Sequence, residues 1–91
     1  MFAASFYSVT PGRFHEVAAV YPRHRAYLNE FALDGDVIMI GTFGNPEQEG
    51  SMAIFRSRQA AERFIRGDPF VVEGLVAEPT ILDWDPLIFS N

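Results

Sequence analysis

The chain has 91 residues, 48% of them hydrophobic and 14% aromatic, with a formal net charge of −5 at pH 7. This length suits a single domain, residues 1–91, and the acidic balance argues against nucleic acid or an anionic membrane surface as partners, because both require basic patches. The absence of cysteine excludes disulfides, thiolate metal sites and a cysteine nucleophile, and it suits a reducing compartment.

The N-terminal stretch lacks the basic start and apolar run of a signal peptide, and no segment approaches the roughly 20 apolar residues of a membrane helix. We therefore expect a soluble, cytoplasmic protein. A domain of this size buries only roughly 60–65% of its unfolded surface. With nine Phe, three Tyr and one Trp, part of its apolar surface is expected to lie between subunits, in a homodimer or a higher homo-oligomer.

The first predicted element is a strand over 2–9, where large and small side chains alternate. Thr10, Pro11 and Gly12 end it. Apolar residues at helical spacing then predict a helix over 14–33. Because Pro22 lacks an amide hydrogen, we expect a short first piece and a main helix over 22–33.

A continuous apolar run predicts the second strand over 37–43, and a polar loop over 44–50 separates it from a third strand over 51–55. Ser57 is expected to cap a second helix, with Gly67 as the residue just past its end.

The last predicted strand covers 76–84 and contains Pro79. A proline cannot donate to the hydrogen-bond ladder, so this strand should lie at a sheet edge. The order β-α-β-β-α-β is the ferredoxin-like pattern of an α+β fold, with a four-stranded antiparallel sheet in the order 4-1-3-2 and two helices on one face. The other face is left bare, and a partner subunit is its simplest cover.

The two histidines differ in their surroundings. His15 stands among charged neighbours near the first turn and is expected to be solvated. His24 precedes Leu28 by four residues and Phe31 by seven, so it shares the buried stripe of the first helix. A histidine in that place is either a core residue bonded to a backbone carbonyl or a functional group.

Asp68 also has two interpretations. Aspartate followed by proline is a good N-cap and N1 pair for a short helical turn. Yet Asp68 follows the carboxyl end of the second helix, where the helix dipole disfavours an anion, and it comes four residues after the apolar Phe64. A carboxylate in that place is relieved by a cation or a histidine.

Four segments of the sequence resemble the YciI-like (YCII-related) family, and the similarity covers nearly the whole chain. They are "RHRAYL" (23–28), the glycine of "IGTF" (Gly41), "GSMAIF" (50–55) and "GDPFVVEGLVAEPTILDW" (67–84). The resemblance implies a ferredoxin-like fold, a dimeric α/β-barrel-like assembly, and an active site in a pocket centred on a histidine and an aspartate. Where family members often carry "AGP", this chain has Ile40, Gly41 and Thr42, so the proline is missing.

Carried over residue by residue, the resemblance makes His24 and Asp68 the catalytic pair and matches Ser51 to the small polar residue that opens the third strand. The two helices pack side by side in this fold, so a contact between His24 and Asp68 is feasible. The carboxylate would fix the tautomer of an imidazole that acts as general acid and base. Tyr7, Ser51 and Phe70 are predicted for the substrate-binding wall.

The resemblance also implies the type of reaction. The family includes a dehydrochlorinase that acts on a chlorinated muconate-type ring-cleavage product, and the fold is similar to that of muconolactone isomerase. Both reactions move a proton next to a carbonyl, as a lyase or an isomerase does without a cofactor. The alternative is a non-catalytic dimeric module that binds a small ligand or a partner.

Other kinds of site are less well supported. One histidine and one aspartate fall short of the three protein ligands of a catalytic zinc site, so no metal is expected. No Gly-x-Ser-x-Gly segment surrounds Ser51, which argues against a hydrolase triad.

Overall fold

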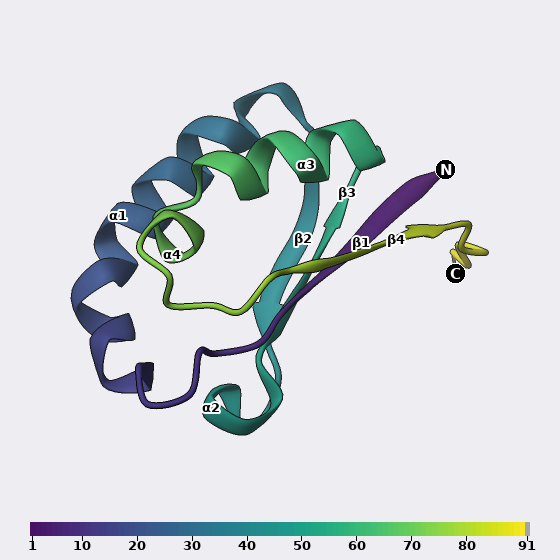
Figure 1. The fold of residues 1–91 in the computed structure, drawn as a ribbon. Helices are drawn as coiled ribbons and strands as arrows, with labels where there is room; N and C mark the ends of the chain where they lie inside the picture. The colour runs from purple at the N-terminus through teal and green to yellow at the C-terminus, as the bar shows by residue number, and fades with distance from the viewer. Residues whose placement is uncertain (91) are drawn as a thin grey trace.

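The computed structural model describes residues 1–90, which form a four-stranded sheet with helices on one face (Figure 1). The strands are β1 (Phe2–Tyr7), β2 (Val37–Thr42), β3 (Ser51–Phe55) and β4 (Thr80–Trp84). The helices are α1 (Val17–Phe31), α2 (Pro46–Glu49), α3 (Arg58–Gly67) and α4 (Pro69–Val72). Two 3₁₀ turns, Phe14–Glu16 and Ala32–Asp34, flank α1.

The sheet order is β2-β3-β1-β4, and every neighbouring pair is antiparallel. This is the expected ferredoxin-like α+β arrangement, in which β4 occupies an edge. Because residues that pair across antiparallel strands share a face, the register places Ala3, Phe55 and Val37 together. These side chains meet α1 and α3 in a core that also contains Leu28 and Phe64.

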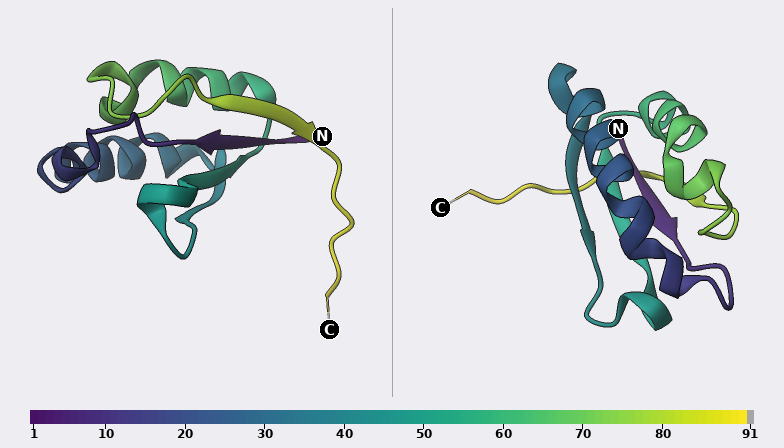
Figure 2. Two further views of the ribbon diagram at one scale, coloured as in Figure 1. Left: turned by 60° about the horizontal axis from the view of Figure 1, so that its bottom comes forward. Right: turned by 90° about the vertical axis from the view of Figure 1, so that its left-hand side faces the viewer.

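The opposite face of the sheet carries no helix (Figure 2). The register places Trp84, Leu82 and Met39 on this face, and all three are exposed. Beyond β4 the chain runs away from the body, and its apolar side chains Leu87, Ile88 and Phe89 are also exposed. The structure thus leaves apolar surface uncovered, as expected for a small domain rich in aromatic residues.

The prediction that Pro22 divides the first helix is wrong, because α1 continues through it from Val17 to Phe31. Proline removes one hydrogen bond of the helix ladder, while buried side chains on both sides of it, Val20 and His24, keep the helix packed against the sheet. Packing outweighs the one lost hydrogen bond.

Three predicted boundaries also differ from the structure. Strand β4 begins at Thr80, just after Pro79, while Val76 forms an isolated bridge with Val9 beyond the end of β1. Gly67 is the last residue of α3 and not the residue after it. A Cβ atom on Gly67 would lie 2.6 Å from the Tyr27 hydroxyl, so this glycine makes room for a neighbouring helix.

The loop predicted between β2 and β3 contains the short helix α2, whose first residue is Pro46. The Asn45 side chain accepts a hydrogen bond from the Gln48 backbone N–H and caps it. The predicted cap at Ser57 is confirmed, since its side chain accepts from the Ala60 N–H. Among residues 1–90, no helix is both long and apolar enough to span a membrane.

Candidate active site

Asp68 lies between α3 and α4 and is fully buried, at 0% exposure. Its Oδ1 atom accepts a hydrogen bond from the Phe70 backbone N–H at 3.1 Å, and Pro69 occupies the first helical position of α4. The capping role expected from the sequence is therefore present. An uncharged residue such as serine could also cap this helix. Because burying a carboxylate costs free energy unless it is hydrogen-bonded, Asp68 is expected to have further partners.

One of those partners is His24, whose Nδ1 atom lies 2.8 Å from Asp68 Oδ1. His24 is on the buried side of α1 with Val20 and Leu28, and only 7% of it is exposed. A carboxylate can only accept, so Nδ1 carries the proton and donates it. In the neutral imidazole this leaves Nε2 with an unshared electron pair, which is the form of a general base.

The other partner is Tyr7, at the end of β1. Its hydroxyl donates to Asp68 Oδ2 at 2.6 Å. Burial and the neighbouring Asp68 carboxylate raise the pKa of Tyr7 well above its ordinary value, so the phenol stays protonated and remains a donor. The sequence predicts Tyr7 only for the pocket wall, because this contact joins residues 61 positions apart.

The second ring nitrogen of His24, Nε2, is not fully buried. It has no hydrogen-bond partner among residues 1–90, and no buried side-chain nitrogen or oxygen there is left without one, so Nε2 is not buried. His24 lines a cavity of about 280 Å³ between α1 and the sheet. The imidazole is thus held on its Nδ1 side and accessible on its Nε2 side.

Phe70 and Ser51 line the same cavity. The Phe70 ring stacks on the His24 imidazole, with 4.2 Å between ring centroids and 16° between planes. Ser51 lies at the start of β3, where the register pairs it with Tyr7. The structure therefore brings His24, Asp68, Tyr7 and Phe70 together, and Ser51 lines the same cavity without a hydrogen bond to His24.

The remaining walls are mostly apolar. Val17 and Leu28 of α1 face Ile40 of β2 across the cavity, and Gly41 and Thr42 continue that wall where the family proline is missing. A smaller apolar cavity of about 70 Å³ adjoins it and shares the Tyr7, Ser51 and Phe70 side chains.

The cavity wall also includes Tyr21 and Arg25, which were not predicted from the sequence. The spacing of Tyr21, three residues before His24, was an available signal, because it places the two side chains beside each other on α1. The spacing of Arg25 gave no such signal, because adjacent residues do not share a helix face. Outside the cavity, Arg23 forms an ion pair with Glu73 that ties α1 to the end of α4. No three His, Asp or Glu side chains within residues 1–90 gather as metal ligands.

Two solved structures share this fold. One is 5-chloro-2-hydroxyhydroquinone dehydrochlorinase (TftG) from Burkholderia phenoliruptrix AC1100, in complex with 2,5-dihydroxybenzoquinone. It has a TM-score of 0.74 at 24% identity, over 93% of this chain and 94% of that one. The other, a conserved protein from Methanosarcina mazei Go1, has a TM-score of 0.53 at 16% identity, over 89% and 87%.

A search of curated proteins finds no significant match. The family model described as the YCII-related domain matches residues 1–85. This match spans β1 to β4 and includes every residue of the His24–Asp68 site. The chain belongs to the YCII-related domain family.

Proposed function

We propose that this YciI-like protein is a small-molecule enzyme that moves a proton next to a carbonyl group, with His24 as general acid and base. One observation carries the proposal: Nδ1 of His24 is held by the buried Asp68, while Nε2 is not fully buried and His24 lines the cavity. An imidazole serving only as a core residue has no need of an accessible second nitrogen. Asp68 acts through His24 by fixing its tautomer and direction.

Loss of hydrogen chloride from a chlorinated hydroxyhydroquinone, the reaction in the name of the structural neighbour, illustrates the chemistry. Nε2 takes the proton of a ring hydroxyl, whose electrons form a carbonyl, and the chlorine-bearing carbon gains a proton. A second hydroxyl then loses its proton as chloride departs with the electrons of the carbon–chlorine bond. One proton and one chloride are released in all, and the ring becomes a hydroxyquinone without an oxidant or a cofactor.

The cavity supports a substrate of one ring. Its volume of about 280 Å³ is at the small end for ligand pockets, and its apolar walls suit a flat ring beside Phe70. Ser51 adds a polar residue to the wall. Because the Tyr7 hydroxyl is engaged by Asp68, Tyr7 contributes its ring to the wall and not its proton.

The assembly proposed for the enzyme is a homodimer of the dimeric α/β-barrel type, in which a partner covers the bare face of the sheet. The exposed Met39, Leu82 and Trp84 side chains support this arrangement. The cysteine-free sequence suits the reducing cytoplasm as the place of action.

The proposed function can be tested by measuring proton transfer to and from ring carbons. Hydroxyhydroquinone is incubated with the protein in deuterium oxide under argon, and deuterium at the ring carbons is measured by mass spectrometry. In parallel, chloride release from 5-chloro-2-hydroxyhydroquinone is recorded. We expect faster exchange than in buffer, and a loss of roughly 10²–10⁴-fold in His24→Asn, because that is the usual contribution of a positioned general base.

The matched control is His15→Asn, because the His15 side chain is solvent-exposed and does not line the cavity around His24. It should keep full activity. Binding of 2,5-dihydroxybenzoquinone beside His24 with neither exchange nor chloride release would favour the non-catalytic binding module. Equal rates in wild type and His24→Asn would contradict the proposed function.

A further inference from the structure

Arg25 follows His24 directly in the sequence and lines the same cavity. Building on the proposed function, we propose that the substrate carries an anionic oxygen, as a carboxylate or a ring oxyanion, and that Arg25 binds it. Arg25 would then select among small-ring substrates by charge, while His24 and Asp68 carry out the proton transfer.

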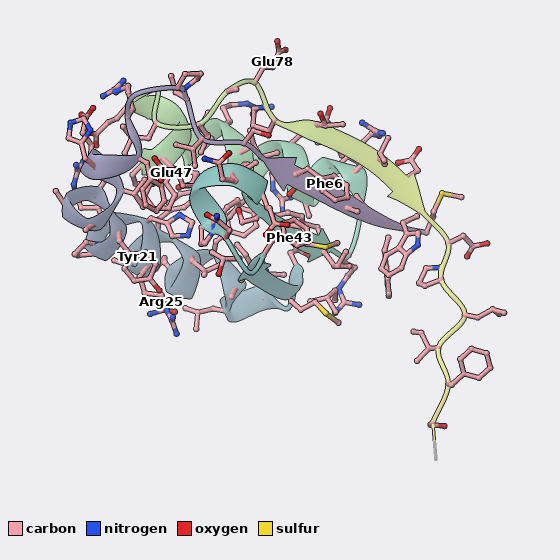
Figure 3. The ribbon with its side chains drawn as sticks, turned by 90° about the horizontal axis from the view of Figure 1, so that it is seen from below. Phe6, Tyr21, Arg25, Phe43, Glu47 and Glu78 are labelled. Carbon is pink, nitrogen blue, oxygen red and sulfur yellow. The ribbon has the colours of Figure 1, made fainter. Side chains whose placement is uncertain are left out.

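The contacts of Arg25 hold its guanidinium without neutralising it. Nε donates to Asn29 Oδ1 at 3.1 Å, and Nη1 donates to the Tyr21 hydroxyl at 3.3 Å. Both partners are uncharged and lie one helical turn away on α1. Figure 3 shows the Tyr21 and Arg25 side chains next to each other on this helix. Nη2 makes no hydrogen bond within residues 1–90, so donors of the guanidinium fork are left for a ligand.

Most other arginines of the described chain are already engaged. Four form ion pairs with carboxylates: Arg13 with Glu16, Arg23 with Glu73, Arg58 with Asp83 and Arg63 with Asp36. Arg56 donates to the Gly35 carbonyl. Arg66 has no carboxylate partner within residues 1–90 either, but it does not line the cavity. Arg25 thus differs from the others in offering an unneutralised charge at the site.

The charge of the cavity wall also favours an anionic ligand. Among residues 1–90, no aspartate or glutamate lines the cavity, and Asp68 is fully buried behind the imidazole. In a chain with a net charge of −5, Arg25 thus gives this wall a fixed positive charge. A guanidinium fork matches the paired oxygens of a carboxylate, and apolar Leu28, Ile40 and Phe70 match a ring. A small anionic ring compound satisfies both parts of the wall.

The test compares two ligands of nearly equal shape, benzoate and benzamide, by NMR titration of signals from His24 and Phe70. We expect wild-type protein to bind benzoate about tenfold more tightly than benzamide. In Arg25→Gln that preference should disappear while benzamide binding is unchanged. Arg66→Gln is the matched control and should keep the preference. Because Arg25 is exposed, the variant should fold as wild type does, which a thermal melt checks.

Equal binding of the two ligands by wild type, an intact preference in Arg25→Gln, or benzoate binding away from His24 would each overturn the inference. The deuterium exchange assay separates its failure from that of the proposed function. Deuterium exchange that depends on His24, without a preference for benzoate, would reject only the anion-binding role of Arg25. A preference for benzoate without any deuterium exchange would reject the proposed enzymatic function and indicate a module that binds anions.

Discussion

His24 Nδ1 and Asp68 Oδ1 lie 2.8 Å apart, although 44 positions separate the two residues in the sequence. The contact joins the middle of α1 to the turn between α3 and α4. Asp68 also accepts from Tyr7 and from the Phe70 N–H, so three donors surround one buried carboxylate. The imidazole is consequently fixed in direction and in tautomer, which is the arrangement that catalysis by a histidine base requires.

Replacing Asp68 by asparagine should damage catalysis more than folding. Asp68 Oδ1 accepts from both the Phe70 N–H and His24, so an amide oxygen in that place keeps the cap of α4 and puts the amide nitrogen against the Tyr7 hydroxyl. In the opposite orientation the cap is lost, and the amide nitrogen favours the His24 tautomer with the proton on Nε2. In both orientations the negative charge that stabilises a protonated His24 during proton transfer is lost. We expect deuterium exchange to fall roughly 10²–10⁴-fold. The free energy of unfolding, from urea titration, should fall by only about 1–3 kcal/mol.

The control for this variant is Asp83→Asn, which makes the same change in an exposed carboxylate paired with Arg58. It should alter neither activity nor stability measurably, because exposed ion pairs contribute little. Full exchange activity in Asp68→Asn would show that the carboxylate does not orient His24.

Tyr7→Phe should change how stability responds to alkaline pH. The pKa of Tyr7 is raised in the folded protein from an ordinary value of 10.0, so above pH 10 the unfolded chain loses a proton that the folded chain keeps. Stability is therefore full below pH 10 and falls as pH rises, by at most about 1.4 kcal/mol per pH unit for this one proton.

The Phe variant lacks that proton and should lose stability less steeply, as measured by urea unfolding between pH 8 and pH 11. Burial also raises the pKa of Tyr27, but that contribution is common to both proteins. Parallel stability curves for wild type and variant would contradict the hydrogen bond between Tyr7 and Asp68.

Gly67→Ala should destabilise the protein through a steric clash. The new Cβ would lie 2.6 Å from the Tyr27 hydroxyl and 3.0 Å from its ring, which packs against Phe64. We expect a loss of about 1–3 kcal/mol in the free energy of unfolding. Gly44→Ala is the control, because its nearest atom is at 3.8 Å. Adding Tyr27→Leu should relieve the clash, and a strictly additive double variant would argue against it.

The bare face of the sheet should form a homodimer interface. Sedimentation at micromolar concentration is expected to give twice the 10.2 kDa mass of the chain. Leu82→Asp should yield monomers, because it places a charge on the exposed apolar face. Leu33→Asp changes a more exposed leucine beside α1 and should leave the dimer intact. A monomeric wild type would contradict this assembly.

The strand and helix order could be predicted from the sequence because each element has its own hydrophobic period. Pro79 also indicated the sheet edge, although β4 begins just after it. Local sequence patterns gave wrong helix boundaries where tertiary contacts determine the structure. Helix α1 continues through Pro22 because its flanking residues are buried. Gly67 is the last residue of α3 and leaves room for Tyr27, a packing role and not the helix-ending role predicted for it.

The site was predictable only in part for the same reason. A buried His24 followed from helical spacing, and the cap at Asp68 followed from the proline after it. Their contact was expected from the fold together with the family resemblance. The hydrogen bond from Tyr7 depends on where β1 ends relative to Asp68, and the position of Arg25 at the cavity depends on the rotation of α1 about its axis. A short sequence motif specifies neither of these positions.

The central claim is that Asp68 holds His24 with its proton on Nδ1 and an unprotonated Nε2 toward the cavity. A long-range ¹H–¹⁵N NMR spectrum of the imidazoles, recorded where His24 is neutral, reads this tautomer directly. His15, which is 77% exposed in its side chain, provides the internal reference. In wild type, His24 is expected to carry its proton on Nδ1. A spectrum with the proton on Nε2 would contradict it, because His24 could not then act as the base.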